Sequence, residues 1–280
     1  MRLMNPVRLA QKLWRSMSVL PQGGSCLPTK TLRRNCFAVQ LRHGSTSRPF
    51  EAKIGDYDWA ALTYDDFAYL FGDIFLKQPV RLPKFAGDRP FIIDAGAHVG
   101  FSCLYFKLCQ PTARILCFEP ATSCFQLLER NIRHNRIEGV DLVHAACGRN
   151  QGEITLFLPQ DQSLANSSHK QWDGAHATEK ARVVRLSDYI DQRVDLLKMN
   201  VEGAEWEIMD DLISTGKLRQ VDNLMVAYHH RMTSPEVRLA EFLRLFQENG
   251  YVYQLSAPFN PQDAYGDKWQ SVDIFAWRPS

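Results

Sequence analysis

Asp94, Gly96 and Gly100 are the residues whose types and spacing first suggest chemistry. They follow the short apolar run 91–93 and precede an apolar helical pattern. This order is typical of a buried parallel strand that ends in a tight turn and opens a helix. Glycine suits positions where a backbone turns sharply or approaches a ligand closely. The pattern therefore indicates either a ligand site or a purely structural turn capped by Asp94.

The carboxylate of Asp94 narrows the choice of ligand. A dinucleotide site presents helix N-terminal amides and a Gly-x-Gly-x-x-Gly turn to an anionic pyrophosphate. This turn has two glycines in a different spacing, and Asp94 stands where it would repel a phosphate. A cationic ligand with hydroxyls and an ammonium group fits better, and S-adenosylmethionine is such a ligand.

Glu119 follows the next apolar run, 114–118, and lies 25 residues after Asp94. In sheets that bind nucleosides, an acidic residue at this place accepts hydrogen bonds from the ribose hydroxyls. We therefore expect Glu119 to bind the ribose, the alternative being a surface or capping carboxylate.

Apolar runs and helical patterns alternate from residue 91 onward, which predicts a mainly parallel sheet with helices wound on both sides. Residues 153–158 and 181–186 predict a hairpin inserted after the third strand, and 251–255 with 272–277 predict an antiparallel C-terminal edge. In the helix that follows the fourth strand, Trp206, Met209 and Ile213 are predicted to face inward. The remaining strands are expected at 91–94, 114–118, 140–146, 195–199 and 223–227, and the helices at 100–110, 125–132, 204–213 and 234–250.

A polar residue or a break in the apolar pattern follows the carboxyl end of each predicted parallel strand. In such sheets, ligands bind at the carboxyl ends of the strands. The sequence therefore predicts a single site, to which Asp94, Glu119, Ala145, Asn200, Glu202, His229 and His230 contribute.

Five features together resemble the FkbM-type methyltransferases: Asp94–Gly100, Phe118-Glu-Pro120, Asn131, the stretch Ala145–Glu153 and Leu196–Glu205. The resemblance implies a class I methyltransferase fold, which is a Rossmann-like doubly wound sheet, and S-adenosylmethionine as the methyl donor. The family members are mostly assigned as O-methyltransferases of sugars, glycolipids or macrolide-like metabolites. The resemblance implies cofactor contacts from Asp94, Gly96 and Glu119, and it places Asn200 and Glu202 beside the methyl-transfer site. We also expect His98, Gly100 and Ala145 to contact the cofactor.

Two residues depart from the family pattern. His98 replaces a usual Asn in the turn, and Asn200 replaces a usual Asp after the fourth strand. An amide cannot act as a general base, so the candidate bases are Glu202, His229 and His230. A divalent ion held by Asn200, Glu202 and one histidine is an alternative that we do not favour.

Three charged residues near this site are expected to have structural roles. Lys198 is expected to pair with a nearby carboxylate, whereas Glu205 and Glu207 are expected to be charges on the helix surface. The acceptor is expected to be a carbohydrate-like or other small hydroxylated metabolite. The alternatives are a cofactor-binding protein without catalysis, because of Asn200, and a nucleic-acid methyltransferase that uses a basic N-terminal arm.

The charge distribution suggests three regions. Residues 1–50 carry nine Lys and Arg and no Asp or Glu, whereas the remaining residues carry 24 basic and 31 acidic residues. The basic part resembles a mitochondrial or plastid transit peptide, or is a disordered extension of a cytoplasmic protein. Residues 51–90 are expected to form a helical cover segment, 91–280 the catalytic domain, and 160–180 with 51–90 a lid over the acceptor.

Composition limits the remaining possibilities. No apolar run approaches the ~20 residues that span a bilayer. The seven cysteines are odd in number and form no Cys-x-x-Cys pair, so neither a disulfide framework nor a zinc site is expected. The acidic body argues against a broad nucleic-acid-binding face.

Overall fold

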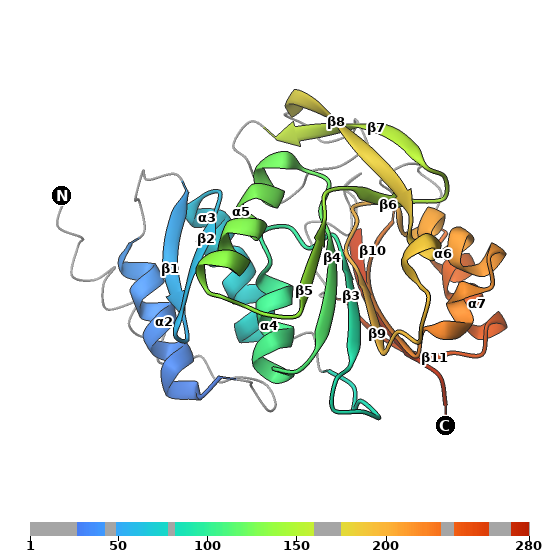
Figure 1. Cartoon of the computed structure of the whole chain (residues 1–280), viewed down its shortest axis with the longest axis horizontal. Helices are drawn as coiled ribbons and strands as arrows, with labels where there is room; N and C mark the ends of the chain where they lie inside the picture. The colour runs from blue at the N-terminus through green and yellow to red at the C-terminus, as the bar shows by residue number, and fades with distance from the viewer. Residues whose placement is uncertain are drawn as a thin grey trace.

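A computed structural model describes residues 27–42, 49–77, 82–159, 175–230, 238–257 and 270–279. Its centre is a seven-stranded sheet in the order β11-β12-β10-β9-β3-β4-β5 (Figure 1). Five neighbouring strands are parallel, and the two at the C-terminal edge are antiparallel. The predicted mainly parallel sheet with an antiparallel edge is confirmed. The parallel strands are β3 (Phe91–Ala95), β4 (Arg114–Phe118), β5 (Val140–Val143), β9 (Leu196–Met199) and β10 (Asn223–His230), and the edge strands are β11 (Val252–Ser256) and β12 (Gln270–Trp277).

Helices cover both faces of this sheet (Figure 1). Every residue of β3 is buried, as expected for a strand enclosed on both sides. On one face lie α4 (Phe101–Cys109) and α5 (Thr122–His134), and on the other α6 (Glu205–Ser214) and α7 (Leu239–Glu248). Short 3-10 turns, η2 (Leu186–Tyr189) and η3 (Lys217–Gln220), complete the helical face around α6.

The inward face of α6 differs from the prediction. Its buried apolar residues are Ile208, Met209 and Leu212, whereas Trp206 and Ile213 are only partly buried. Both residues still pack against the core, but the helix is rotated by about one position relative to the predicted stripe. The start of the next predicted helix, at residues 234–237, lies outside the described residues.

The N-terminal part contains more structure than the sequence suggested. Helix α2 (Thr29–Leu41), within the predicted leader, buries Leu32, Cys36 and Val39 in the core. Residues 1–26 lie outside the described part, so the targeting hypothesis stays a prediction.

Residues 51–90 are not wholly helical, contrary to prediction. They begin within a β-hairpin, whose register pairs Ile54 with Tyr57 and leaves a two-residue loop that contains Gly55. The burial of β1 alternates strictly, which is the period-two signal that the aromatic residues of this segment obscured. The elements of this segment are β1 (Phe50–Ile54), β2 (Tyr57–Ala61), α3 (Tyr64–Phe71) and the π-helix η1 (Gly72–Lys77).

A three-stranded sheet, in the order β6-β8-β7, follows β5, which is an edge strand of the seven-stranded sheet. Its antiparallel pair is the predicted inserted hairpin. The predicted third strand divides into β5 and β6, and β8 begins inside the predicted 160–180 loop. The strands are β6 (Ala146–Gly148), β7 (Gly152–Pro159) and β8 (Ala175–Arg185). Residues 160–174, the rest of the predicted lid, lie outside the described part.

A disulfide was not expected from the sequence, but one cysteine forms one. Cys109 is disulfide-bonded. Within the described residues, no helix has the length and apolar character needed to cross a membrane. The free thiols are Cys36, Cys103, Cys117, Cys124 and Cys147, all of which are buried.

Asn131 of α5 ties the hairpin to the turn after β3. Its fully buried amide accepts a hydrogen bond from the N–H of Ala60 and donates to the carbonyls of Ala60 and Val99, each at 2.9 Å. Asn131→Leu would leave these three backbone groups unpaired, and we expect it to lower the free energy of unfolding by about 2–4 kcal/mol. Urea unfolding measures this change. The exposed Asn150→Leu is the matched control, and an equal effect of both substitutions would contradict the role of Asn131.

Candidate functional site

The carboxylate of Asp94 lies fully buried near the end of β3. Its Oδ1 lies 2.8 Å from Nζ of Lys198, and its Oδ2 accepts a hydrogen bond from the hydroxyl of Ser102. Lys198 also donates to the carbonyl of Gly96 at 2.8 Å. The predicted pairing of Lys198 with a carboxylate is confirmed. Asp94 therefore organises the turn through protein groups, with its charge matched by Lys198.

Gly96 is required because two strand ends approach each other closely. Its φ is +79°, and a Cβ added there would lie 1.9 Å from the carbonyl oxygen of Asn200. The N–H of Asn200 in turn donates to the carbonyl of Ala95 at 3.0 Å. Gly100 also has a positive φ, of +89°, and a Cβ there would lie 2.7 Å from the side chain of Leu128. Both glycines thus allow close packing of the turn itself.

Glu119, at the end of β4, joins this turn directly. It is 4% exposed, and its two carboxylate oxygens accept hydrogen bonds from the N–H groups of His98 (2.8 Å) and Ala121 (2.9 Å). Burial raises the pKa of Glu119 to about 7, although the two N–H groups favour the carboxylate. Each oxygen retains a further lone pair for a hydroxyl donor.

His98 has the left-handed conformation in the turn, with a φ of +52°. Burial, and secondarily the nearby Lys198, lowers its pKa to about 4, so the imidazole is neutral at physiological pH. Both ring nitrogens are shielded from solvent, and neither has a hydrogen-bond partner among the described residues. A polar ligand at the turn would supply these partners, so His98 and Glu119 together fit the nucleoside-containing cofactor that the sequence suggested.

Three predicted site residues have simpler positions. Asn200 follows β9 with an exposed side chain, whereas Ala145 is fully buried between β5 and β6. His230 ends β10, and its side chain lies outside what the structure describes.

Glu202 and His229 lie together at the ends of the adjacent strands β9 and β10. Glu202 has a φ of +51°, and its Oε2 lies 3.5 Å from Nε2 of His229. The opposite ring nitrogen, Nδ1, lies 2.9 Å from Oε1 of Glu205. His229 therefore lies between two carboxylates.

Glu205 was expected to be a surface charge, and this prediction is wrong. It is fully buried at the first position of α6, whereas Glu207 is exposed as predicted. The backbone before α6 is irregular, with positive φ values at Glu202 and Gly203. The sequence periodicity therefore does not indicate which face of the helix its first residue occupies. A carboxylate beside a helix N-terminus was the available signal, but it suits a surface position equally.

The two carboxylates change the protonation of His229. Burial alone would lower its pKa, but Glu202 and then Glu205 more than offset this and raise it to about 9. His229 is therefore an imidazolium at neutral pH, in contrast to the near-reference pKa that the sequence suggested. Burial also raises the pKa of Glu202, an effect that His229 partly counteracts. Among the described residues, no group of three or more His, Cys, Asp or Glu side chains is arranged to hold a metal ion.

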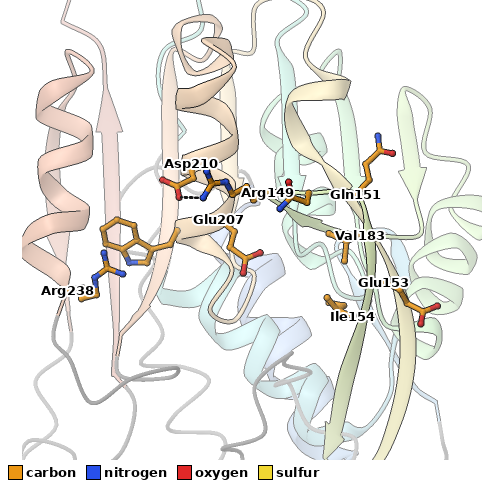
Figure 2. A pocket seen from close by; sticks show the side chains of 11 residues that line it. Arg149, Gln151, Glu153, Ile154, Val183, Glu207, Asp210 and Arg238 are labelled. Atoms are coloured by element: carbon orange, nitrogen blue, oxygen red, sulfur yellow. Dashed lines mark hydrogen bonds and ion pairs between the residues drawn. The ribbon is translucent and has the colours of Figure 1, made fainter.

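A pocket of about 560 Å³ lies elsewhere, between the small sheet and the helices α6 and α7 (Figure 2). Arg149 and Asp210, which both line it, form an ion pair at 3.5 Å, and Arg238 lies at the N-terminal end of α7. No residue predicted for the site at the strand ends lines this pocket. Its lining consists of Arg149, Asn150, Gln151, Gly152, Glu153, Ile154, Val183, Trp206, Glu207, Asp210 and Arg238.

Comparisons with known proteins identify a family and several relatives. The family model described as "Methyltransferase FkbM domain" matches residues 94–253. The chain is 31% identical over 166 residues to "Methyltransferase 1" of Beauveria bassiana, a match that covers 51% of this chain and 66% of that protein. It is 28% identical over 198 residues to "Methyltransferase sdnD" of Sordaria araneosa, covering 59% of this chain and 76% of that protein.

A solved structure, described as methyltransferase FkbM from Methylobacillus flagellatus KT, is similar at 15% identity with a TM-score of 0.48. That match covers 96% of this chain and 59% of the other. The chain thus spans just under two thirds of the first curated relative and about three fifths of this structure.

Proposed function

Because the chain belongs to the FkbM-type methyltransferase family, we propose that it transfers a methyl group from S-adenosylmethionine to a hydroxyl group. The acceptor is a sugar, a glycolipid or another small metabolite. The observation that carries this proposal is the meeting of the β3 turn, Glu119, Glu202 and His229 at the carboxyl ends of neighbouring parallel strands.

The residues of the turn have different roles toward the cofactor. When bound, S-adenosylmethionine supplies a methyl group on a positively charged sulfur. Glu119 accepts hydrogen bonds from the ribose hydroxyls, and the neutral imidazole of His98, whose ring nitrogens have no partner among the described residues, hydrogen-bonds to a polar atom of the cofactor. Asp94 pairs with Lys198, which in turn holds the carbonyl of Gly96 and so fixes the backbone of the turn. The turn therefore binds and orients the cofactor.

Acidic side chains near the ends of β9 and β10 favour an uncharged acceptor. Among the described residues, Glu202, Glu205 and Asp273 all act on His229, and the cations that act there are the imidazolium itself and Lys198, which is paired with Asp94. A phosphate-rich chain would be repelled from such a surface. This supports a neutral hydroxylated metabolite over a nucleic acid.

Methyl transfer itself is tested with isotope-labelled S-adenosylmethionine and a panel of neutral mono- and oligosaccharides and small hydroxylated metabolites. We expect a labelled methyl ether as the product. If the protein binds S-adenosylmethionine but transfers no label to any acceptor, it is a binding protein and the proposed reaction is wrong.

Glu119→Gln is expected to weaken S-adenosylmethionine binding by about 10- to 100-fold, because an amide accepts the ribose hydroxyls less strongly than a carboxylate. Isothermal titration measures the dissociation constant. In the wild type, the pKa of about 7 means that Glu119 must lose a proton before it binds at lower pH. Affinity should therefore rise between pH 6 and pH 8, and this dependence should disappear in Glu119→Gln.

The exposed Glu207→Gln, which lines the separate pocket, is the control for this titration. It should leave the dissociation constant unchanged at every pH. Unchanged binding in Glu119→Gln as well would refute the role of Glu119 in the cofactor site.

A further inference from the structure

Glu202, His229 and Glu205 form a row that runs from the surface of the site into the core. Their side chains are 17%, 5% and 1% exposed, in that order. The 2.9 Å contact with Glu205 and the 3.5 Å contact with Glu202 lie on opposite ring nitrogens of His229. An acceptor that approaches the strand ends therefore meets Glu202 first.

The proton positions on His229 follow from its neighbours. A carboxylate only accepts hydrogen bonds, so Nδ1 carries a proton and donates it to Glu205. Nε2 faces the second carboxylate, Glu202, and an imidazolium carries a proton there too. His229 thus has no lone pair available for a proton from the acceptor, whereas the carboxylate of Glu202 does.

Other charged groups near this row come from several elements. Asp273 of β12 also acts on His229, and Lys198 of β9 acts on Glu202. Tyr69 of α3 lies within electrostatic range of both Glu202 and Asp273. Asp273 favours the imidazolium form of His229. Burial and Glu205 raise the pKa of Glu202, whereas His229 and Lys198 lower it and so favour the ionised form.

We propose that Glu202 is the general base of methyl transfer, and that the buried Glu205 is a positioning residue that acts on it through the imidazolium of His229. This inference rests on the proposed function and adds the identity of the base. Asn200 cannot fill this role because an amide does not accept a proton at neutral pH.

The proton and the electrons balance in a single step. The O–H bond of the acceptor breaks and its proton passes to the carboxylate of Glu202. The electron pair of the oxygen forms the new bond to the methyl carbon, and the sulfur keeps the pair of the bond that it loses. His229 remains an imidazolium throughout, hydrogen-bonded to Glu205 and facing Glu202.

The first test measures His229 without any acceptor. In the full chain with S-adenosylmethionine, NMR titration of ¹⁵N-labelled histidine should show His229 losing its proton near pH 9. Glu205→Gln removes one of its carboxylates, so this pKa should fall by about one unit or more. Glu205→Asp should restore most of the shift, and Glu207→Gln on the same helix should have no effect. An unchanged titration in Glu205→Gln would overturn the proposal.

The second test measures the pH profile of turnover on an acceptor that the labelled-methyl panel identifies. Wild-type turnover should rise as Glu202 ionises and fall near pH 9 as His229 loses its proton. In Glu205→Gln the alkaline limb should move to lower pH by the same interval as the NMR titration. Glu202→Gln should lower kcat by about 10²-fold or more with S-adenosylmethionine binding retained.

The outcomes separate the two proposals. A lower kcat in Glu205→Gln with an unmoved alkaline limb would make Glu205 merely structural and overturn the inference. Turnover that increases through pH 9 in the wild type would make His229 the base instead. A wild type that binds S-adenosylmethionine but methylates no acceptor refutes the proposed function. In that case the NMR titration tests only whether Glu205 controls the protonation of His229.

Discussion

Gly96→Ala is expected to lower the free energy of unfolding by about 2–6 kcal/mol and to abolish S-adenosylmethionine binding. The added Cβ would lie 1.9 Å from the carbonyl oxygen of Asn200, and the φ of +79° strains any residue with a side chain. The ends of β3 and β9 would have to separate. The cofactor turn would then lose its shape, because the close approach of Gly96 to Asn200 fixes it. Urea unfolding and isothermal titration measure the two effects.

Substitutions at two other glycines distinguish backbone strain from steric overlap as the cause of this effect. Gly216 has a positive φ of +72° but open space around its Cβ position, and Gly87 has open space without a positive φ. Gly216→Ala should therefore show backbone strain alone, of about 1–2 kcal/mol, and Gly87→Ala almost none. If Gly96→Ala is no worse than Gly216→Ala, the close approach to Asn200 does not constrain the turn.

Asp94→Ala is the second substitution with a large expected effect. It would leave Lys198, whose side chain is only 15% exposed, without its ion-pair partner, and would remove the acceptor of the Ser102 hydroxyl. Loss of one partner from a buried pair costs about 3–5 kcal/mol. We also expect S-adenosylmethionine binding to be lost, because Lys198 would no longer be held against the carbonyl of Gly96.

A double-mutant cycle tests this explanation by urea unfolding. Asp94→Ala combined with Lys198→Met should be less destabilised than the sum of the single variants, because no unpaired charge is left buried. The exposed pair Lys53–Asp58 is the control, and Lys53→Met should change stability by less than about 1 kcal/mol. Strict additivity of the two substitutions would show that Asp94 and Lys198 do not act as a pair.

The sequence was sufficient for the central sheet because each parallel strand carries two signals. A short apolar run identified the strand, and a polar residue or glycine after it identified the end that faces the site. Arg114–Phe118 was predicted with the observed bounds for this reason. The contact between Glu119 and the turn then follows from the pairing of adjacent strands.

The parts that were missed depend on contacts distant in sequence. The burial of Glu205 requires His229, 24 residues away, and no local pattern reveals that partner. The ion pair of Asp94 was likewise not assigned to a particular lysine and carboxylate, because Lys198 lies on a strand 104 residues further along the chain. The β1–β2 hairpin did carry a local alternating signal, but its aromatic residues also fit a short amphipathic helix.

The contacts of Asn131 also bear on how this enzyme family is divided into folding units. The family match begins at residue 94, yet the amide of Asn131 joins the carbonyl of Val99 to the backbone of Ala60. Trp59, from the same hairpin, lies against the position where Gly100 has no side chain. A chain cut at residue 90 would keep every predicted cofactor contact but lose the support beneath the turn. The segment that matches the family model and the segment that supports the turn therefore begin at different residues, and the second includes the hairpin.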